Sequence, residues 1–247
     1  MRYFVFFSYD GTAYHGWQIQ PNAHSVQAEM QRALSLLLGS DAELVGAGRT
    51  DTGVHARVMA AHFDAAPIDC AELARRLNRV LPADIEVDRI VPVSDDAHAR
   101  FSALSRTYHY FVRRRKLPFR RHYAALFAFP LDIDRMNAAA AVLLGTHDFA
   151  SFCKVGGNSK TTLCRVDAAA WTEVEPDLWR FEIKADRFLR NMVRAIVGTL
   201  IDVGRGKISV DDFADIIQSR DRCAAGESAP ANGLFLVDVA YPENIFL

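Results

Sequence analysis

The part of the chain richest in groups that could do chemistry is residues 46–56, which read Gly-Ala-Gly-Arg-Thr-Asp-Thr-Gly-Val-His-Ala. One guanidinium, Arg49, and one carboxylate, Asp51, stand among three glycines. Glycine allows positive φ and lets the backbone pass close to a ligand. The composition predicts a loop built to present Asp51. The alternative is a long hairpin connection in which Asp51 only turns the chain and Arg49 is solvated.

A second group of candidates lies in the segment 188–203, which we predict to be a long helix. Its apolar residues form a stripe wide enough to bury one face. Arg187, Arg190 and Arg194 recur at i, i+3 and i+7 beside that stripe. For the first two, a solvated basic edge is the better interpretation. Arg194 lies at the margin of the apolar stripe, where an arginine is seldom left without a carboxylate.

The third candidate is the predicted strand at 107–113. Its alternation places Tyr108 and Tyr110 on one side of a sheet and His109 on the other. Tyrosines on one strand face usually belong to a core or an interface. They could equally form a platform on which RNA bases stack.

The elements that position these residues begin with a six-element series. Strands are predicted at 2–9, 42–45, 57–64 and 85–93, and helices at 26–38 and 70–80. Ser25 and Asp69 are the expected N-caps of the two helices, and Gly39 is expected to end the first. The order strand, helix, strand, strand, helix, strand is that of a ferredoxin-like unit.

The second half of the chain repeats this order. Strands are predicted at 107–113, 165–173, 178–184 and 234–241, and helices at 132–144 and 188–203. The insertion at 204–232 is expected to hold a short helix that starts at Ser209. We therefore predict an α+β fold of two similar ferredoxin-like (βαββαβ) halves, residues 1–102 and 103–247, with a mostly antiparallel sheet.

Composition is ordinary for a soluble globular protein, with 50% hydrophobic and 24% charged residues among 247. No apolar run is long enough to cross a membrane, and the N-terminus reaches Asp10 too soon for a signal peptide. The expected location is cytoplasmic. The four cysteines and eight histidines show no spacing typical of a metal site, so no metal is predicted.

The net charge of −1 argues against a nucleic-acid-binding protein, but the distribution of charge argues for one. Between Asp96 and Asp132 there is no acidic residue, and the cations of this stretch are Arg100, Arg106, Arg113, Arg114, Arg115, Lys116, Arg120 and Arg121. This basic segment could track phosphates, or it could be a solvated loop. The polar run 154–160 is interpreted as a loop only.

Residues 48–55 closely resemble the active-site motif G-R-T-D-x-G-V-H of the TruA family of bacterial tRNA pseudouridine synthases. Thr52 stands where alanine is commoner, at the variable position of the motif. The segments 101–108, 184–198 and 233–237 resemble the second motif, the third motif and the closing strand of that family. The likeness runs from Tyr9 to Leu236, nearly the whole chain. Four motifs in the right order are hard to obtain by accident.

The resemblance implies isomerisation of uridine to pseudouridine at positions 38 to 40 in the anticodon stem-loop of tRNA. It assigns Asp51 as the catalytic carboxylate, Arg194 as its partner and Tyr108 as the residue that stacks on the target base. Arg49 would fill the space left by the flipped base or hold a phosphate, and Leu234 would line the pocket. Substrate and product share one formula, so no cofactor or metal is expected. Family members resemble homodimers that bind one tRNA across both subunits.

Two other functions fit parts of the sequence. A non-catalytic RNA-binding protein would explain the tyrosines and the basic segment, but it gives no reason for pairing Asp51 with Arg194. An enzyme that cradles a phosphate with residues 46–48 would need a Gly-Lys-Ser/Thr ending and a following helix, and this sequence has neither.

Overall fold

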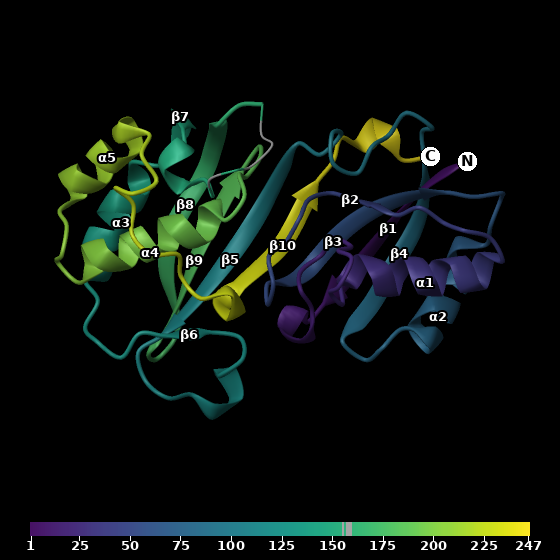
Figure 1. Ribbon diagram of the computed structural model, residues 1–247, viewed down its shortest axis with the longest axis horizontal. Helices are drawn as coiled ribbons and strands as arrows, with labels where there is room; N and C mark the ends of the chain where they lie inside the picture. Colours follow the sequence, from purple (N-terminus) through teal and green to yellow (C-terminus); the bar gives the residue numbers. More distant parts are fainter. Residues whose placement is uncertain (155, 157–159) are drawn as a thin grey trace. The chain divides into compact units, whose positions relative to one another are not determined.

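The computed structural model describes residues 1–154, 156 and 160–247, and the chain forms two compact units (Figure 1). The first unit comprises Met1–Ser105 and Phe235–Leu247, and the second comprises Arg106–Leu234. Most of the polar run predicted as a loop, residues 155 and 157–159, lies outside the described residues.

The first unit is built on a sheet whose centre is the antiparallel series β4-β1-β3. Its strands are β1 (Arg2–Tyr9), β2 (Val45–Gly46), β3 (His55–Asp64), β4 (Ile85–Val93) and β10 (Leu234–Ala240). The other edge of β3 is shared by two strands. β2 pairs antiparallel with the C-terminal part of β3, at Ala61 and His62. β10 pairs parallel with the first residues of β3, His55 and Ala56. The order of elements is the predicted one, although β2 is shorter than expected.

The two helices of this unit are α1 (Val26–Leu38) and α2 (Cys70–Val80), which contact each other, and α2 packs along β4. Their predicted caps are present. The Ser25 side chain accepts a hydrogen bond from the Ala28 N–H, and Asp69 accepts one from the Glu72 N–H. Gly39 ends α1 with φ of 71°, a left-handed conformation that glycine adopts without strain.

The end of the chain groups with the first unit, whereas the division by sequence placed it in the second half. The reason is aromatic packing on β1. The Tyr241 ring meets Phe4 edge to face, with centroids 5.0 Å apart, and its hydroxyl donates a hydrogen bond to the Ala99 carbonyl. The Ser94 N–H donates to the carbonyl of Ile245.

The second unit holds a sheet in the order β5-β9-β8-β7, antiparallel throughout, with β6 parallel to β5. Its strands are β5 (Ser105–Arg113), β6 (Ala125–Leu126), β7 (Gly145–Asp148), β8 (Leu163–Glu175) and β9 (Leu178–Ala185). The helices α3 (Ile133–Ala141), α4 (Met192–Gly204) and α5 (Val210–Ser219) contact one another, and α3 also packs on β8.

Short 3₁₀ turns occur in both units. They occupy Gly11–Ala13, Pro118–Arg120, Ala150–Phe152, Ala231–Gly233 and Glu243–Ile245.

The start of α4 differs from the prediction. The helix begins only at Met192, because Asn191 before it adopts a left-handed φ of 66°, and residues 187–189 have no regular structure. The apolar pattern already includes Phe188 and Leu189, so periodicity gave no sign of this later start. Arg187 and Arg190 therefore precede the helix and do not form a face of it with Arg194.

Much of the basic segment is paired inside the second unit. Arg113 is buried and donates to the carbonyls of Ala124 and Arg115. Arg114 and Arg115 both contact Asp177, at 3.1 and 2.8 Å, in the turn between β8 and β9.

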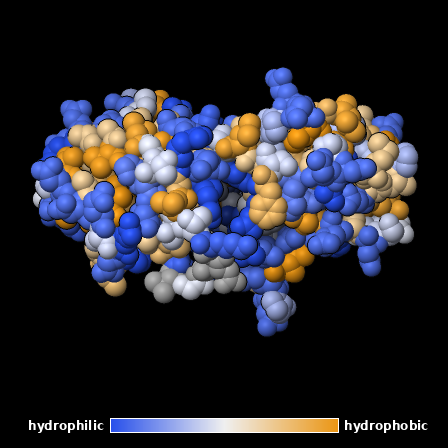
Figure 2. Space-filling model, turned by 90° about the horizontal axis from the view of Figure 1, so that it is seen from above, coloured by the Kyte–Doolittle hydropathy of each residue, from blue (hydrophilic) through white to orange (hydrophobic). Residues whose placement is uncertain are grey.

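The surface seen in Figure 2 is largely hydrophilic with scattered hydrophobic patches. No helix among the described residues is long and apolar enough to cross a membrane.

His62 makes the stability of the first unit depend on pH. Its ring is buried between Phe4 and His98, and its Nδ1 accepts a hydrogen bond from the Ala99 N–H. Burial, aided by the nearby charges of His98 and Arg2, lowers the pKa of His62 from 6.5 to about 4. Between these two values the unfolded chain binds a proton that the folded protein excludes.

The free energy of unfolding should therefore fall as the pH drops from 6.5 towards 4, by up to about 1.4 kcal/mol per pH unit from this group. Urea unfolding at a series of pH values measures the slope. The variant His62→Gln keeps an acceptor for the Ala99 N–H but cannot titrate, so its slope should be shallower. Equal slopes for the two proteins would contradict the assignment.

Candidate active site

The predicted active-site loop connects β2 to β3 and spans residues 47–54. It is shorter than the sequence suggested, because His55 and Ala56 already belong to β3. At its start, the Ala47 N–H donates to the Ala60 carbonyl at 2.8 Å. At its end, the Val54 N–H donates to the Asp51 carbonyl at 3.1 Å and closes a turn.

A second segment of the first unit braces this loop through backbone hydrogen bonds on both sides of Asp51. The Trp17 N–H donates to the Thr50 carbonyl at 3.2 Å, and the Gly53 N–H donates to the Tyr14 carbonyl at 3.3 Å. Gly16 lies between the two contacts with φ of +87°, and a Cβ on it would stand 2.3 Å from the Thr50 oxygen. The backbone that carries Asp51 is thus fixed by its neighbours.

Successive side chains of the loop point in different directions. Thr50 is buried, and its Oγ1 lies 2.8 Å from the Tyr9 hydroxyl in a hydrogen bond. Arg49 is exposed and Asp51 is half-buried. This arrangement leaves Arg49 accessible to a large ligand and holds Asp51 at the margin of the protein interior.

The three glycines of residues 46–56, one at the end of β2 and two in the loop, have different physical roles. Gly53 needs its positive φ of 77°. Gly46 makes room for the indole of Trp17, which would lie 2.6 Å from an added Cβ. Gly48 has nothing within 4 Å of an added Cβ, so this glycine leaves open space beside the chain.

The strand that follows the loop is anchored by His55. This residue is buried, its Nδ1 accepts a hydrogen bond from the Gly11 N–H at 3.1 Å, and its ring stacks on Phe235 with centroids 4.5 Å apart. The same two residues pair in the parallel register of β3 and β10. The C-terminal strand therefore helps to hold the exit of the Asp51 loop.

In the second unit, the two tyrosines of β5 differ in environment. Tyr110 is fully buried, and its hydroxyl donates to the Pro230 carbonyl at 2.8 Å. Burial raises the pKa of Tyr110 well above its ordinary value, so it is a core residue and not a base platform. Tyr108 is half-buried, and its ring meets Phe188 edge to face with centroids 5.0 Å apart. The interpretation as a stacking residue stays open for Tyr108 alone.

Arg194 lies near the start of α4, and its Nε donates to the Ala229 carbonyl at 2.7 Å. Leu234 is buried at the start of β10. Arg49 and Asp51 belong to the first unit, and Tyr108, Arg194 and Leu234 belong to the second. The pairing of Asp51 with Arg194 therefore stays a prediction.

No cluster of three or more histidine, cysteine or acidic residues suited to a metal occurs within residues 1–154, 156 and 160–247. The four cysteines are free thiols. Burial raises the pKa of the Cys164 thiol to about 12, so this residue is an unreactive core group.

Comparison with known proteins assigns the chain to a family. A family model described as tRNA pseudouridine synthase matches residues 5–102 and 139–242. The tRNA pseudouridine synthase A of Bacteroides fragilis is 54% identical over 247 residues, covering 99% of this chain and 98% of the relative. That of Parabacteroides distasonis is 52% identical over 247 residues, with coverages of 99% and 98%.

The chain belongs to the tRNA pseudouridine synthase family. The predicted family, the α+β fold class and the isomerase class are thereby confirmed. One chain of a solved Cbf5-Nop10-Gar1 complex is 13% identical with a TM-score of 0.39, covering 95% of this chain and 48% of that chain. That likeness is loose, and the assignment stands on the sequence matches.

In each unit, residues that position the candidate side chains of this synthase could not be identified from the sequence. Tyr9 binds the loop through Thr50, Phe188 packs on Tyr108, and Ala229 binds Arg194. Ala229 carries no chemical signal, because it acts through its backbone. Phe188 is predicted within a helix stripe, but it lies in the irregular segment before α4.

The close contact at Gly16 yields a prediction about stability. Gly16→Ala would place a methyl group 2.3 Å from the Thr50 oxygen and would strain a residue at φ +87°, so the loop must shift. We expect a loss of about 1–3 kcal/mol in the free energy of unfolding. Gly48→Ala is the matched control, because open space surrounds that position. Equal melting temperatures for the two variants in thermal unfolding would contradict this account.

Proposed function

We propose that this protein isomerises uridine to pseudouridine at positions 38 to 40 in the anticodon stem-loop of tRNA, with Asp51 as the catalytic carboxylate. The observation that carries the proposal is the loop 47–54, in which backbone hydrogen bonds from the segment 14–17 hold the family motif around Asp51. Family membership supports the reaction, and the fixed loop supports the choice of residue.

The chemistry requires a group that assists cleavage of the glycosidic C–N bond before the base rotates and bonds through C5. A carboxylate does this only while it is ionised. Closure of a base-sized pocket would disfavour the charged form, and a guanidinium hydrogen-bonded to Asp51 would restore it. We assign that guanidinium to Arg194. Attack at C1′, attack at C6 and assisted release of the base are all compatible with this arrangement.

The target uridine must leave its stack to reach a carboxylate, at a cost of a few kcal/mol. Tyr108 is proposed to stack on the flipped base and recover about 1–3 kcal/mol of that cost. The edge-to-face contact with Phe188 supports this role, because it fixes the plane of the Tyr108 ring. Arg49, exposed next to Asp51, is proposed to fill the vacated space or to bind a phosphate. Leu234 is proposed to line the pocket.

The basic segment is proposed to hold the RNA stem through its phosphates, reading shape more than sequence. Its cations are already engaged in part, since Asp177 contacts Arg114 and Arg115. These ion pairs are largely exposed, so a phosphate can compete for the same guanidinium groups at little cost. We further propose a cytoplasmic homodimer that needs no cofactor or metal.

Replacing Asp51 by asparagine tests the catalytic assignment. Asp51→Asn keeps the size of the side chain and removes its charge, so tRNA binding should stay within about twofold of the wild type. Pseudouridine formation should fall at least about 1,000-fold. The measurements are equilibrium binding of an unmodified tRNA transcript and chemical mapping of pseudouridine in it. Product at a normal rate in the variant would show that another group is catalytic.

Substitutions at Tyr108 separate stacking from proton transfer. Tyr108→Phe keeps the ring and should retain most of the activity, whereas Tyr108→Ala should lose about 10- to 100-fold in kcat/KM because stacking is gone. Single-turnover rates on the same transcript provide the comparison. A loss in Tyr108→Phe as large as that in Tyr108→Ala would show that the hydroxyl moves a proton.

A further inference from the structure

A segment of irregular backbone, residues 225–230, lies along α4 in the second unit, and we call it the brace. It contains no helix or strand, and its ends are the turn after α5 and the 3₁₀ turn Ala231–Gly233. Backbone outside regular structure needs other partners for its polar groups. Those partners identify what the brace does.

The brace binds Arg194 at two points. The Ala229 N–H donates to the Arg194 carbonyl at 2.9 Å, and the Arg194 Nε donates to the Ala229 carbonyl at 2.7 Å. The two bonds close a ring between one residue of α4 and one residue of the brace. A guanidinium is planar, so a bond at Nε fixes the direction in which both Nη groups point.

Side chains around the brace hold its other polar groups. Thr199 Oγ1 accepts from the Gly226 N–H at 2.9 Å, and the Tyr110 hydroxyl donates to the Pro230 carbonyl at 2.8 Å. The Asn191 amide donates to Ser228 Oγ at 2.6 Å. The Arg222 guanidinium donates to the carbonyls of residues 225 and 226 and to Ser228 Oγ, at 3.3, 3.2 and 3.2 Å.

The brace lies so close to α4 that Gly198 has no room for a side chain, and Gly226 has little. A Cβ on Gly198 would stand 1.7 Å from the Glu227 carbonyl oxygen, and one on Gly226 would stand 3.0 Å from Asp202 Oδ2. Gly198 is one turn beyond Arg194 on α4, so the contact runs along the helix face that carries the arginine. The position of the brace on α4 therefore constrains the position of Arg194.

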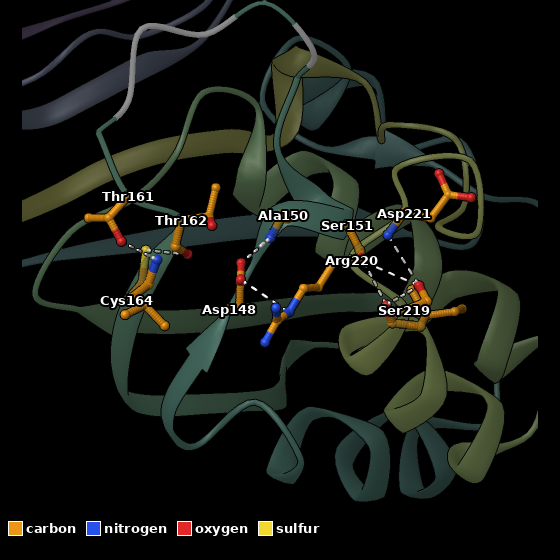
Figure 3. Close-up of polar contacts among 11 residues, drawn as sticks. Asp148, Ala150, Ser151, Thr161, Thr162, Cys164, Ser219, Arg220 and Asp221 are labelled. Carbon is orange, nitrogen blue, oxygen red and sulfur yellow. Dashed lines mark hydrogen bonds and ion pairs between the residues drawn. The ribbon is translucent and has the colours of Figure 1, made fainter.

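The chain enters the brace from a fixed point at the end of α5, where Figure 3 shows a cluster of polar contacts. The Arg220 Nε lies 3.2 Å from Asp148 Oδ2, and Ser151 Oγ donates to the Ile216 carbonyl at 2.6 Å. Ser219 Oγ accepts from the Asp221 N–H at 3.3 Å. Both ends of the brace are therefore anchored within the second unit.

The side chains of the brace add little to the apolar core. Within the brace Ala229 is buried, whereas Glu227 and Pro230 are exposed and Ser228 is half-buried. The polar bonds instead hold the residues on both sides of Ala229, which binds Arg194. We infer that the brace, held by the positioning residues Thr199 and Arg222, fixes the orientation of the Arg194 guanidinium for catalysis.

The inference rests on the proposed role of Arg194 at Asp51. A displacement of about 1 Å in a catalytic group can cost about 100-fold in rate. Arg194 is assigned to the carboxylate and not to the RNA backbone, so loosening the brace should lower kcat and leave KM for tRNA unchanged.

Two substitutions at Thr199 form a matched test in the full-length protein. Thr199→Val keeps the shape of this buried side chain and removes the acceptor for the Gly226 N–H, whereas Thr199→Ser keeps the acceptor and removes a methyl group. We expect kcat to fall about 10- to 100-fold in Thr199→Val with unchanged KM, and to stay within about threefold of wild type in Thr199→Ser. If the Thr199 side chain serves packing alone, Thr199→Ser will lose more activity than Thr199→Val, and the inference will be wrong.

A spectroscopic measurement gives a readout that does not depend on activity. In protein labelled with ¹⁵N-arginine, the Nε–H signal of Arg194, assigned by its loss in Arg194→Lys, should exchange slowly with water. Exchange should quicken in Thr199→Val and remain slow in Thr199→Ser. Should Thr199→Val fail to fold, Ser228→Ala, which removes the oxygen that binds Asn191 and Arg222, replaces it in both experiments.

The outcomes separate the two proposals. Normal kcat and slow Nε–H exchange in Thr199→Val would overturn the proposed role of the brace. An inactive Arg194→Lys would at the same time leave the proposed function standing. Full activity in Arg194→Lys would overturn the role of Arg194 and the brace together.

Discussion

The hydrogen bond from the Trp17 N–H to the Thr50 carbonyl is the contact on which the proposed site depends most. It joins the segment after β1 to the loop before β3, at the residue that precedes Asp51. The companion bond from the Gly53 N–H to the Tyr14 carbonyl holds the other side of the same loop. A carboxylate on a short connection between strands would otherwise sample many directions. Here the backbone on both sides of it has one position.

In the second unit too, hydrogen bonds to backbone groups fix the residue that carries the charged side chain. Arg194 is held through its backbone carbonyl and its Nε by Ala229, and polar side chains hold the residues on either side of that alanine. In both units, charged side chains with proposed chemical roles stand on backbone that is fixed by other backbone. Groups placed in this way need little reorganisation when a reaction begins.

The outline of the fold and the main candidate residues could be predicted from the sequence, because the signals were local. Ser25, Gly39 and Asp69 mark helix ends where the structure has them. The likeness of residues 48–55 to a known motif selected Asp51. These signals lie within a few residues of the features that they predict.

What could not be predicted depends on contacts between distant segments. The helix α4 starts after Asn191 although its apolar pattern begins at Phe188, and the C-terminal residues join the first unit because Tyr241 packs on Phe4. Asp177 forms ion pairs with two arginines of the basic segment, although it lies more than 60 residues further along the chain. Ala229 has no side-chain polarity at all, and its importance comes from its position beside α4.

The most direct test of the central claim follows a hydrogen atom. Formation of the new C–C bond displaces the hydrogen at C5 of the target uridine, so tRNA transcribed with 5-tritiated uridine reports each isomerisation as tritium released to water. The account predicts release only from positions 38 to 40, by the purified protein without added metal or cofactor, and a rate that collapses when Asp51 is changed to asparagine. Tritium retained by the wild-type reaction, or released at the same rate by that variant, would contradict it.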